Sequence, residues 1–172
     1  FIGEATDDEA GSALASAGDV DGDGLGDVVV GRELNFGVEV IGSAYVVLGS
    51  SLGTSRTIDF ADADYKLVGE HEIDFAGYAV AGPADVDGDG LSDLLVGARG
   101  NNAGGDYAGA AYVILGSSLG TSQTVKLSDA DYKLVGEFTG DYAGWPVASA
   151  GDVDADGRDD VLVGASGYDQ DA

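Results

Sequence analysis

The chain has 172 residues, enough for one ordinary domain, with 32 Asp and Glu against 7 Lys and Arg and a formal net charge of −25 at pH 7. This charge argues against nucleic acid and anionic membranes as partners. At 44% hydrophobic the chain is too apolar for simple disorder, and it has no cysteine for a disulfide framework or a thiolate metal site.

Internal repetition organises the chain from its first residues. Phe1-Ile-Gly-Glu4 matches Leu67-Val-Gly-Glu70 and Leu134-Val-Gly-Glu137, and because the chain starts in repeat register we expect it to be a piece of something longer. No stretch approaches the roughly 20 apolar residues of a membrane span, so membrane insertion is not expected. The expected repeats are residues 1–66, residues 67–133 and a partial third copy, residues 134–172.

The first predicted strand of each repeat is built from small residues. It covers residues 13–18, 79–84 and 147–151, which are rich in Ala, Gly, Ser and Val. Small side chains suit strands that are crowded near an axis. A nine-residue acidic loop follows each strand directly, at residues 19–27, 85–93 and 152–160.

Each acidic loop has aspartates at positions 1, 3, 5 and 9 and a glycine at position 6. This pattern wraps oxygen ligands around a hard cation, because the glycine permits a sharp turn and the carbonyl of residue 7 then points inward. We predict three Ca²⁺ sites, one in each loop. The predicted ligands are the side chains of Asp19, Asp21, Asp23, Asp27, Asp85, Asp87, Asp89, Asp93, Asp152, Asp154, Asp156 and Asp160, and the main-chain oxygens of Leu25, Leu91 and Arg158.

Electrostatics favours the same interpretation. Two unit charges about 4 Å apart repel by roughly 1 kcal/mol even at the dielectric of water, so converging aspartates need a counter-charge. Ca²⁺ accepts about six to eight oxygens in loose geometry, whereas Mg²⁺ prefers fewer protein ligands and keeps its waters. The alternative is a solvated acidic turn, since Asp and Gly are ordinary turn residues. Three copies in one register favour the metal site.

The second predicted strand follows each loop, in the apolar runs Asp27–Gly31, Asp93–Gly97 and Asp160–Gly164. Short β-branched runs bounded by glycine are typical of buried strands. An EF-hand is excluded, because it needs helices on both sides and a Glu at position 12 of the loop. The residues at that position are Val30, Val96 and Val163.

Two further strands complete each repeat. The third is predicted at residues 44–48 and 111–115, and the fourth at residues 65–70 and 132–137. A variable loop, residues 32–42 and 99–109, precedes the third strand, and the Ser-Leu-Gly-Thr-Ser linker after it is expected to be a loop. Four short antiparallel strands per repeat predict an all-β chain of β-propeller-type blades, with each cation loop between the first and second strands.

The sequence also predicts the contacts of a few large side chains. Arg32 and Arg99 occupy matching positions, where a salt bridge to a nearby carboxylate is expected. Trp145 is expected in the core. Four tyrosines are expected to pack between blades: Tyr45, Tyr65, Tyr112 and Tyr132.

The sequence resembles a known family at the segments Gly144–Gly157 and Asp160–Ala165 and at their counterparts in the other repeats. It is similar to the FG-GAP repeats of integrin α-subunit propellers, and more closely to the longer repeats of large secreted bacterial proteins. The resemblance implies a β-propeller with Ca²⁺ in the hairpin loops of successive blades. The Phe-Gly pair is altered to Phe75-Ala-Gly77 and Tyr142-Ala-Gly144, which leaves the metal ligands untouched.

The number of blades suggests a partner. Propellers typically close with about 4–8 blades, and this chain supplies two complete ones. Unpaired strand edges template further pairing, so we expect more of the same sequence to complete them, on this chain or on other copies. The alternatives are a longer protein, an assembly of several chains, or open stacking into a fibre.

Three functions are compatible with these features. The first is a non-enzymatic, Ca²⁺-stabilised module with a structural or adhesive role, secreted or at the cell surface; the alternative within it is a subunit of a self-assembling extracellular filament. The second, less favoured, is the propeller part of a secreted enzyme, since the single histidine, His71, lies in a linker and no catalytic triad is evident. The third is a binding module whose variable loops hold a protein or glycan ligand.

Overall fold

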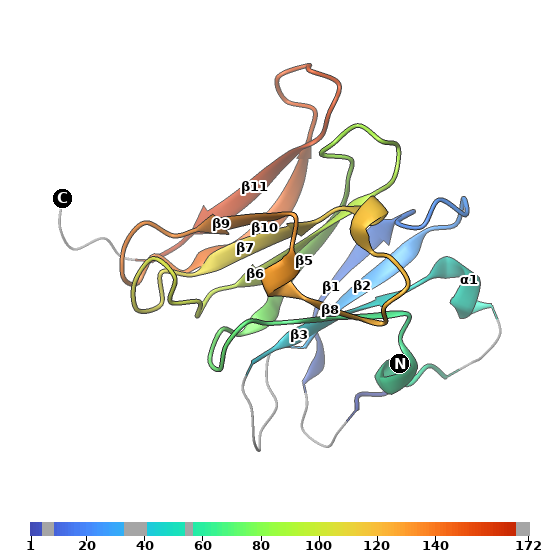
Figure 1. The fold of residues 1–172 in the computed structure, drawn as a ribbon, viewed down its shortest axis with the longest axis horizontal. Coiled ribbons are helices and arrows are strands. Elements are labelled where there is room, and N and C mark those ends of the chain that lie inside the picture. Colours follow the sequence, from blue (N-terminus) through green and yellow to red (C-terminus); the bar gives the residue numbers. More distant parts are fainter. Residues whose placement is uncertain (5–8, 33–40, 54–56, 168–172) are drawn as a thin grey trace.

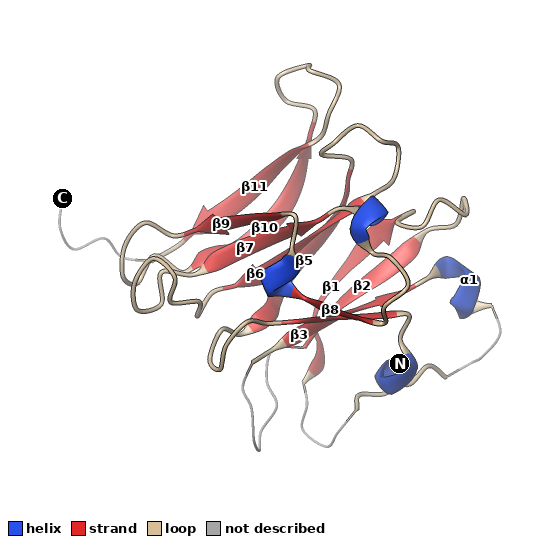
Figure 2. Ribbon diagram, in the orientation of Figure 1, coloured by secondary structure: helices blue, strands red, loops and turns tan. Residues whose placement is uncertain are grey.

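The computed structural model describes residues 1–4, 9–32, 41–53 and 57–167. In these residues the chain forms mainly antiparallel sheets that lie side by side, joined by loops and short helical turns (Figures 1 and 2). Most of the first variable loop lies outside the described ranges. None of the helices found in them has the length and apolar character needed to cross a membrane.

The first repeat forms one blade. Its strands are β1 (Ala10–Gly18), β2 (Asp27–Arg32), β3 (Ser43–Val47) and β4 (Tyr65–Val68), each antiparallel to the next. Every residue of β3 is buried, as expected for a continuous apolar run with neighbours on both faces.

The later repeats use the same order of strands. The second blade consists of β5 (Ala76–Ala84), β6 (Asp93–Ala98), β7 (Ala110–Ile114) and β9 (Tyr132–Val135). The third repeat contributes the hairpin of β10 (Ala143–Gly151) and β11 (Asp160–Ala165). The predicted fold class, four-stranded antiparallel blades with the acidic loop between the first and second strands, is confirmed.

The strand ends differ from the prediction. The first strand of each repeat begins three or four residues earlier, at Ala10, Ala76 and Ala143, because a register shift lets it continue past the glycine that follows. The fourth strand ends two residues earlier, at Val68 and Val135. The chain turns away there: the Gly69 N–H donates to Gly42 rather than to a ladder partner in β3.

The linker before the fourth strand is more ordered than expected. In the first repeat it contains α1 (Gly49–Leu52) and the 3-10 turn η1 (Phe60–Asp62). In the second it contains η2 (Gly116–Ser118), β8 (Thr124–Lys126) and η3 (Leu127–Asp129). The prediction of a plain loop was wrong, because β8 is stabilised by a strand of the other repeat, which local composition does not reveal.

β8 joins the two blades at their outer edge. It runs parallel to β4, with Leu67 opposite Val125 and Val68 opposite Lys126. A corresponding parallel bridge in the first repeat places Ile2 opposite Asp59. A short strand of one repeat therefore covers the outer strand that precedes it in the chain.

The core lies between blades as well as within them. Its largest cluster of buried apolar side chains draws on the first repeat (Ala17, Val29, Leu67) and on the second (Val80, Leu94, Tyr112). A smaller cluster joins Leu95 of the second repeat to Val147 of the third. Burying apolar surface is the dominant favourable term in folding, so adjacent repeats stabilise one another.

Close glycine contacts set the spacing of the inner strands. A Cβ built on Gly31 would collide with the carbonyl oxygen of Gly77, and one built on Gly97 with that of Gly144. The glycine of each Phe-Ala-Gly or Tyr-Ala-Gly element thus lies against a glycine near the end of the second strand of the preceding blade. The backbones approach so closely that a side chain has no room.

The aromatic expectations are met in part. Tyr112 is fully buried in the cluster that the first two blades share, and Tyr65 donates its hydroxyl to Gly120 O of the next repeat. Tyr45 is also fully buried, but in a cluster whose members all belong to the first repeat. Tyr132, by contrast, is 55% exposed. Trp145 is 40% exposed, so the expectation of a core position was wrong: its ring packs edge-to-face on Tyr78 at the rim of the blades.

The two matching arginines are both held by named contacts. Arg32 forms the expected salt bridge, with 2.9 Å between its Nη1 and Glu4 Oε2. The guanidinium of Arg99 lies over aromatic rings, 4.0 Å from the centroid of Tyr78 and 5.6 Å from that of Trp145, and its salt bridge stays a prediction. Such cation–π contacts stabilise a partly desolvated cation.

Candidate metal centres

The acidic loops connect the first two strands of each repeat and project from the same edge of the sheets (Figure 1). The strands bring the first and last aspartates of each loop together. Gly18 pairs with Asp27 across the β1–β2 hairpin, and Gly151 pairs with Asp160 in the same way. The loop therefore starts and finishes at adjacent positions, and its nine residues must curl back on themselves.

In every loop the carboxylates at positions 1, 3 and 9 converge. Their oxygens lie within 4.8 Å of one another. A Ca²⁺–oxygen distance of about 2.3–2.6 Å places two ligands of one ion at most about 5 Å apart, so each group is the right size for a single ion. The groups are Asp19, Asp21 and Asp27; Asp85, Asp87 and Asp93; and Asp152, Asp154 and Asp160.

Backbone hydrogen bonds hold the loop around its first carboxylate. In the first loop Asp19 accepts the N–H of Gly22 at 2.7 Å and that of Gly24 at 2.9 Å. Asp85 accepts the equivalent bonds from Gly88 and Gly90. Gly24 has φ +86°, in the left-handed region that favours glycine, which is the physical reason for the glycine at position 6.

In the first two loops the ninth residue is the buried member of the site. Asp27 is 2% exposed, and its two oxygens accept the N–H groups of Val20 at 2.8 Å and Gly49 at 2.7 Å. Asp93, fully buried, is held in the same manner by Val86 and Gly116. This carboxylate thus links the loop to the segment after the third strand.

The electrostatics of the ninth aspartate are unfavourable without a cation. Burial raises the pKa of Asp27 above its ordinary value, and the charges of Asp21 and Asp19 raise it further, against the N–H donors, which lower it. Burial and the charges of Asp87 and Asp85 raise the pKa of Asp93 likewise. A dication among these oxygens would stabilise their ionised forms. An all-oxygen donor set with buried, repelling carboxylates therefore fits Ca²⁺.

The aspartates at position 5 are placed differently. Asp23, Asp89 and Asp156 are not in the converging groups found among the described residues. Each accepts the N–H of the residue at position 7, at 2.7 to 2.9 Å. Their role as ligands stays a prediction, as does that of the main-chain oxygens of Leu25, Leu91 and Arg158.

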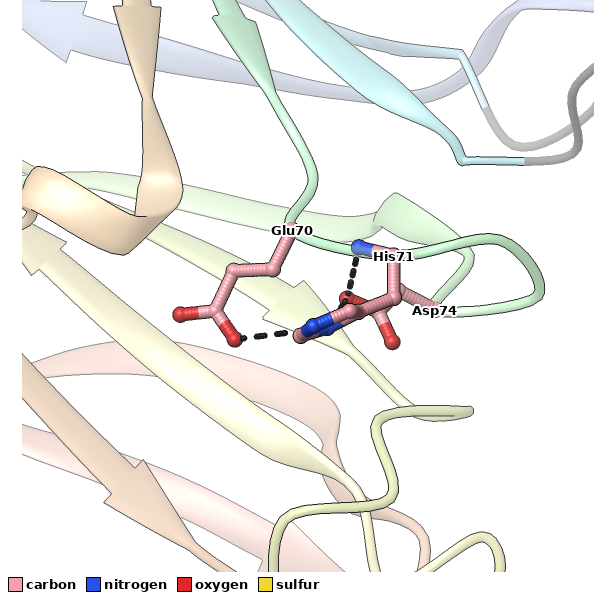
Figure 3. Close-up of side chains that lie close together, drawn as sticks. All are labelled: Glu70, His71 and Asp74. Carbon is pink, nitrogen blue, oxygen red and sulfur yellow. Dashed lines mark hydrogen bonds and ion pairs between the residues drawn. The ribbon is translucent and has the colours of Figure 1, made fainter.

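A further cluster was missed at the sequence level. The Nδ1 atom of His71 lies 3.8 Å from Glu70 Oε2 and 3.7 Å from Asp74 Oδ2 (Figure 3). These carboxylates already have partners, because Lys133 Nζ lies 2.6 Å from Glu70 Oε2 and Asn101 donates to Asp74 at 3.1 Å. Glu70, His71 and Asp74 lie within one short stretch of the sequence, whereas Asn101 and Lys133 come from other segments, and no sequence signal joins these two to the cluster.

This cluster belongs to a structural contact that occurs twice. Glu4 pairs with Lys66 at 2.7 Å, as Glu70 pairs with Lys133. Glu70 comes two residues after β4, and Glu4 two residues after the isolated bridge of Ile2, while the lysines lie on the outer strands β4 and β9. The side chain of His71 is 75% exposed.

Comparisons with known proteins identify the repeat. Residues 76–114, which contain β5, the second acidic loop, β6 and β7, match the FG-GAP repeat family. Integrin alpha pat-2 of Caenorhabditis elegans is 30% identical over 129 residues, 74% of this chain and 10% of that protein. Integrin alpha-4 of Xenopus laevis is 28% identical over 157 residues, 89% of this chain and 14% of that protein.

A relative of another kind shows the same likeness. Phosphatidylinositol-glycan-specific phospholipase D of Bos taurus is 35% identical over 166 residues, 90% of this chain and 18% of that protein. The chain spans less than a fifth of the length of each of these relatives. The chain therefore carries an FG-GAP repeat and is related in sequence to segments of integrin α subunits and of phosphatidylinositol-glycan-specific phospholipase D.

Proposed function

We propose that the chain is a calcium-binding β-propeller module with a structural role, in which one Ca²⁺ in each acidic loop stabilises its blade. The observation that carries this proposal is the convergence of three carboxylates in every loop, one of them buried in the first two loops. The buried aspartate connects the ion to the body of the blade through Val20 and Gly49, or through Val86 and Gly116.

The expected energetic effect is large. A site at 100 times its dissociation constant adds about 2.7 kcal/mol to stability. Three independent sites would add roughly 8 kcal/mol, comparable to the 5–15 kcal/mol net stability of a typical domain. Because the metal would supply so much of the stability, its proposed role is structural.

Isothermal titration calorimetry tests the proposal. Titrating the metal-free chain with Ca²⁺ should give three equivalents, and Mg²⁺ should compete only weakly. Asp19→Asn and Asp87→Asn should each remove one equivalent, because each disables a different loop. A matched Asp106→Asn variant, which changes an exposed aspartate outside the loops, should keep all three. Absence of saturable Ca²⁺ binding would refute the proposal.

We further propose that the module is not an enzyme and that it acts outside the cell, secreted or at the cell surface. Metal ligation would keep the loop carboxylates ionised and unavailable for acid–base chemistry. Extracellular calcium concentrations suit loops of this kind. An adhesive role, a protein or glycan ligand at the variable loops, and the likeness to long repeats of large secreted bacterial proteins belong to the same proposal.

A second candidate function, self-association into a filament, is favoured by exposed apolar side chains. Leu67 on β4 is fully buried, whereas its counterpart Leu134 on β9 is 38% exposed. Leu95 on β6 is fully buried, whereas its counterpart Leu162 on β11 is 59% exposed. Among the described strands, β9 pairs only with β7 and β11 only with β10, so both offer an open edge.

The partner proposed for these edges is a further repeat of the same type. A peptide with the sequence of residues 110–127 contains the two strands, β7 and β8, that would complete them, and it should bind the chain. Leu119 and Leu127 are buried in the core, so the same peptide with both leucines changed to aspartate is the matched control. Equal binding of the two peptides, or of neither, would refute this candidate. Light scattering in Ca²⁺ then shows whether the completing repeat comes from another copy of the chain, which would give assemblies larger than a monomer, or from the same chain.

A further inference from the structure

Neighbouring acidic loops are hydrogen-bonded to each other. The N–H of Ser92, at position 8 of the second loop, donates to Asp19 O at 2.8 Å, and the N–H of Asp19 donates to Ser92 Oγ at 3.2 Å. The next pair repeats this arrangement. The N–H of Asp159 donates to Asp85 O at 2.8 Å, and the N–H of Asp85 donates to Asp159 Oδ2 at 3.0 Å. The eighth residue of one loop thus binds both main-chain groups of the first residue of the preceding loop.

Packing between the loops supports this contact independently. A Cβ built on Gly22, at position 4 of the first loop, would lie 3.0 Å from the Leu91 side chain of the second loop. A Cβ on Gly88 would lie 3.6 Å from Arg158 Cγ of the third loop. The third loop has Ala155 at this position, at φ +63°, although a glycine would adopt that conformation more easily. In both loops that have glycine at position 4, a side chain of the next loop thus lies close to that glycine.

The contact involves the residues that would hold the metal. Asp19 and Asp85 each contribute the first carboxylate of a converging group. Fixing the N–H and C=O of such a residue restricts its backbone dihedrals, and thereby the direction of its side chain. Ser92 and Asp159 are each followed directly by a ninth-position carboxylate, Asp93 or Asp160, of the next loop.

We propose that Ser92 and Asp159 are positioning residues that couple each metal loop to the next, so that Ca²⁺ in one loop raises the affinity of the loop before it. The proposal rests on the calcium binding proposed above and deepens it. Ordering the second loop around a cation fixes Ser92, which in turn orients Asp19. By linkage, Ca²⁺ in the first loop must raise the affinity of the second by the same factor.

A double-mutant cycle measures the coupling. Asp87→Asn disables the second loop while retaining the side-chain oxygen that accepts the Asp89 N–H. Ser92→Gly removes the Oγ that accepts the Asp19 N–H, keeps the main-chain bond to Asp19 O, and introduces the residue found at position 8 of the first loop, Gly26. The readout is the Ca²⁺ dissociation constant of the first loop, followed by NMR through the amide of Gly24.

The expected result is a difference between backgrounds. Asp87→Asn should weaken Ca²⁺ binding in the first loop about fivefold or more when Ser92 is present, as typical coupling energies give. In the Ser92→Gly background the same change should weaken it less than twofold. If Ser92 merely supported the first loop, its loss would weaken binding equally whether the second loop binds or not. Equal effects of Asp87→Asn in the two backgrounds would overturn the proposal.

Two controls make the result specific. Ser92→Asp introduces the acceptor that the third loop uses, Asp159, and should retain the coupling. Gly26→Ser places the hydroxyl at position 8 of the first loop, where a Cβ meets no atom within 4 Å, and should leave the coupling between the first two loops unchanged. A wild-type chain whose Gly24 amide does not respond to Ca²⁺ would refute calcium binding itself, which distinguishes that failure from the failure of the coupling.

Discussion

The Oδ1 atom of Asp93 accepts a hydrogen bond from the N–H of Gly116, which lies 2.9 Å away in space and 23 positions later in the chain. Asp27 and Gly49 repeat the relationship at 2.7 Å. The last aspartate of each of these loops is thereby fixed by the segment that follows the third strand. A cation held by this carboxylate would stabilise the whole blade, because the loop and the blade share one buried acceptor.

Removing one loop charge should have opposite effects with and without calcium. Asp21→Asn keeps an oxygen to accept the Asp23 N–H but removes a charge that raises the pKa of Asp27. We expect the metal-free variant to gain up to about 1 kcal/mol, the repulsion of two charges at about 4 Å in water. In Ca²⁺ the variant should be less stable than wild type. Urea unfolding in EDTA and in Ca²⁺ checks both signs, with Asp106→Asn as the matched control; a loss of stability in both conditions would contradict the expectation.

The buried aspartates predict a pH dependence of the metal-free protein. The pKa of Asp27 and of Asp93 is raised above 3.8, so the folded state binds their protons more tightly than the unfolded state does. The stability they contribute is therefore present below the ordinary pKa and is lost as pH rises through the raised folded-state values. Carboxyl ¹³C NMR titration in EDTA should show both groups titrating above 3.8. Titration at or below that value would show that burial and repulsion do not dominate there.

The pKa of Glu70, beside the outer strand β4, is shifted in the opposite direction to the pKa values of the buried aspartates. Burial would raise the pKa of Glu70, but the hydrogen bond and the charge of Lys133 outweigh it, and the net pKa lies below 4.5. The stability from this pair is present above pH 4.5 and is lost as pH falls through the lower folded-state pKa. Glu70→Gln should cost about 1–3 kcal/mol at pH 7, because it leaves the Lys133 ammonium without its carboxylate.

The third repeat offers a matched control for that change. Glu137 is the counterpart of Glu70 and is exposed. In urea unfolding, Glu137→Gln should therefore change the free energy of unfolding by less than about 0.5 kcal/mol. Equal losses in the two variants would show that the Glu70–Lys133 contact contributes no more than a surface charge does.

The contact between glycines predicts a large effect from a single methyl group. Gly97→Ala should destabilise the chain by about 2 kcal/mol or more, because the added Cβ would collide with Gly144 O and force two blades apart. Gly53→Ala is the control, since no atom lies within 4 Å of its added Cβ. Thermal unfolding in Ca²⁺ measures both variants. A harmless Gly97→Ala would show that the blades are not held at this spacing.

The sequence predicts the blades well because their signal is local. The succession of small-residue strand, acidic loop and β-branched run is contained in residues 13–31, 79–97 and 147–164, and each repeat shows it in the same register. Valines and leucines after the loop form β2, β6 and β11 as expected. The convergence of Asp19, Asp21 and Asp27 follows from the same local geometry.

Contacts between repeats could not be predicted in this way. β8 is three residues long and forms only because β4 of the other repeat lies beside it. The exposure of Leu162 against the burial of Leu95 likewise depends on which sheets are neighbours, and not on the side chains themselves. The contact of Ser92 with Asp19 joins residues 73 positions apart, and a serine in an acidic turn gives no hint of it.

The central claim is that Ca²⁺ in the acidic loops stabilises the blades, and thermal unfolding in Ca²⁺ and in EDTA tests it most directly. Three sites worth roughly 8 kcal/mol, at about 2–4 °C per kcal/mol for a chain of this size, predict a Tm higher by roughly 15 °C or more in Ca²⁺. Mg²⁺ at the same concentration should give a much smaller shift. Superimposable melting curves in Ca²⁺ and in EDTA would contradict the claim.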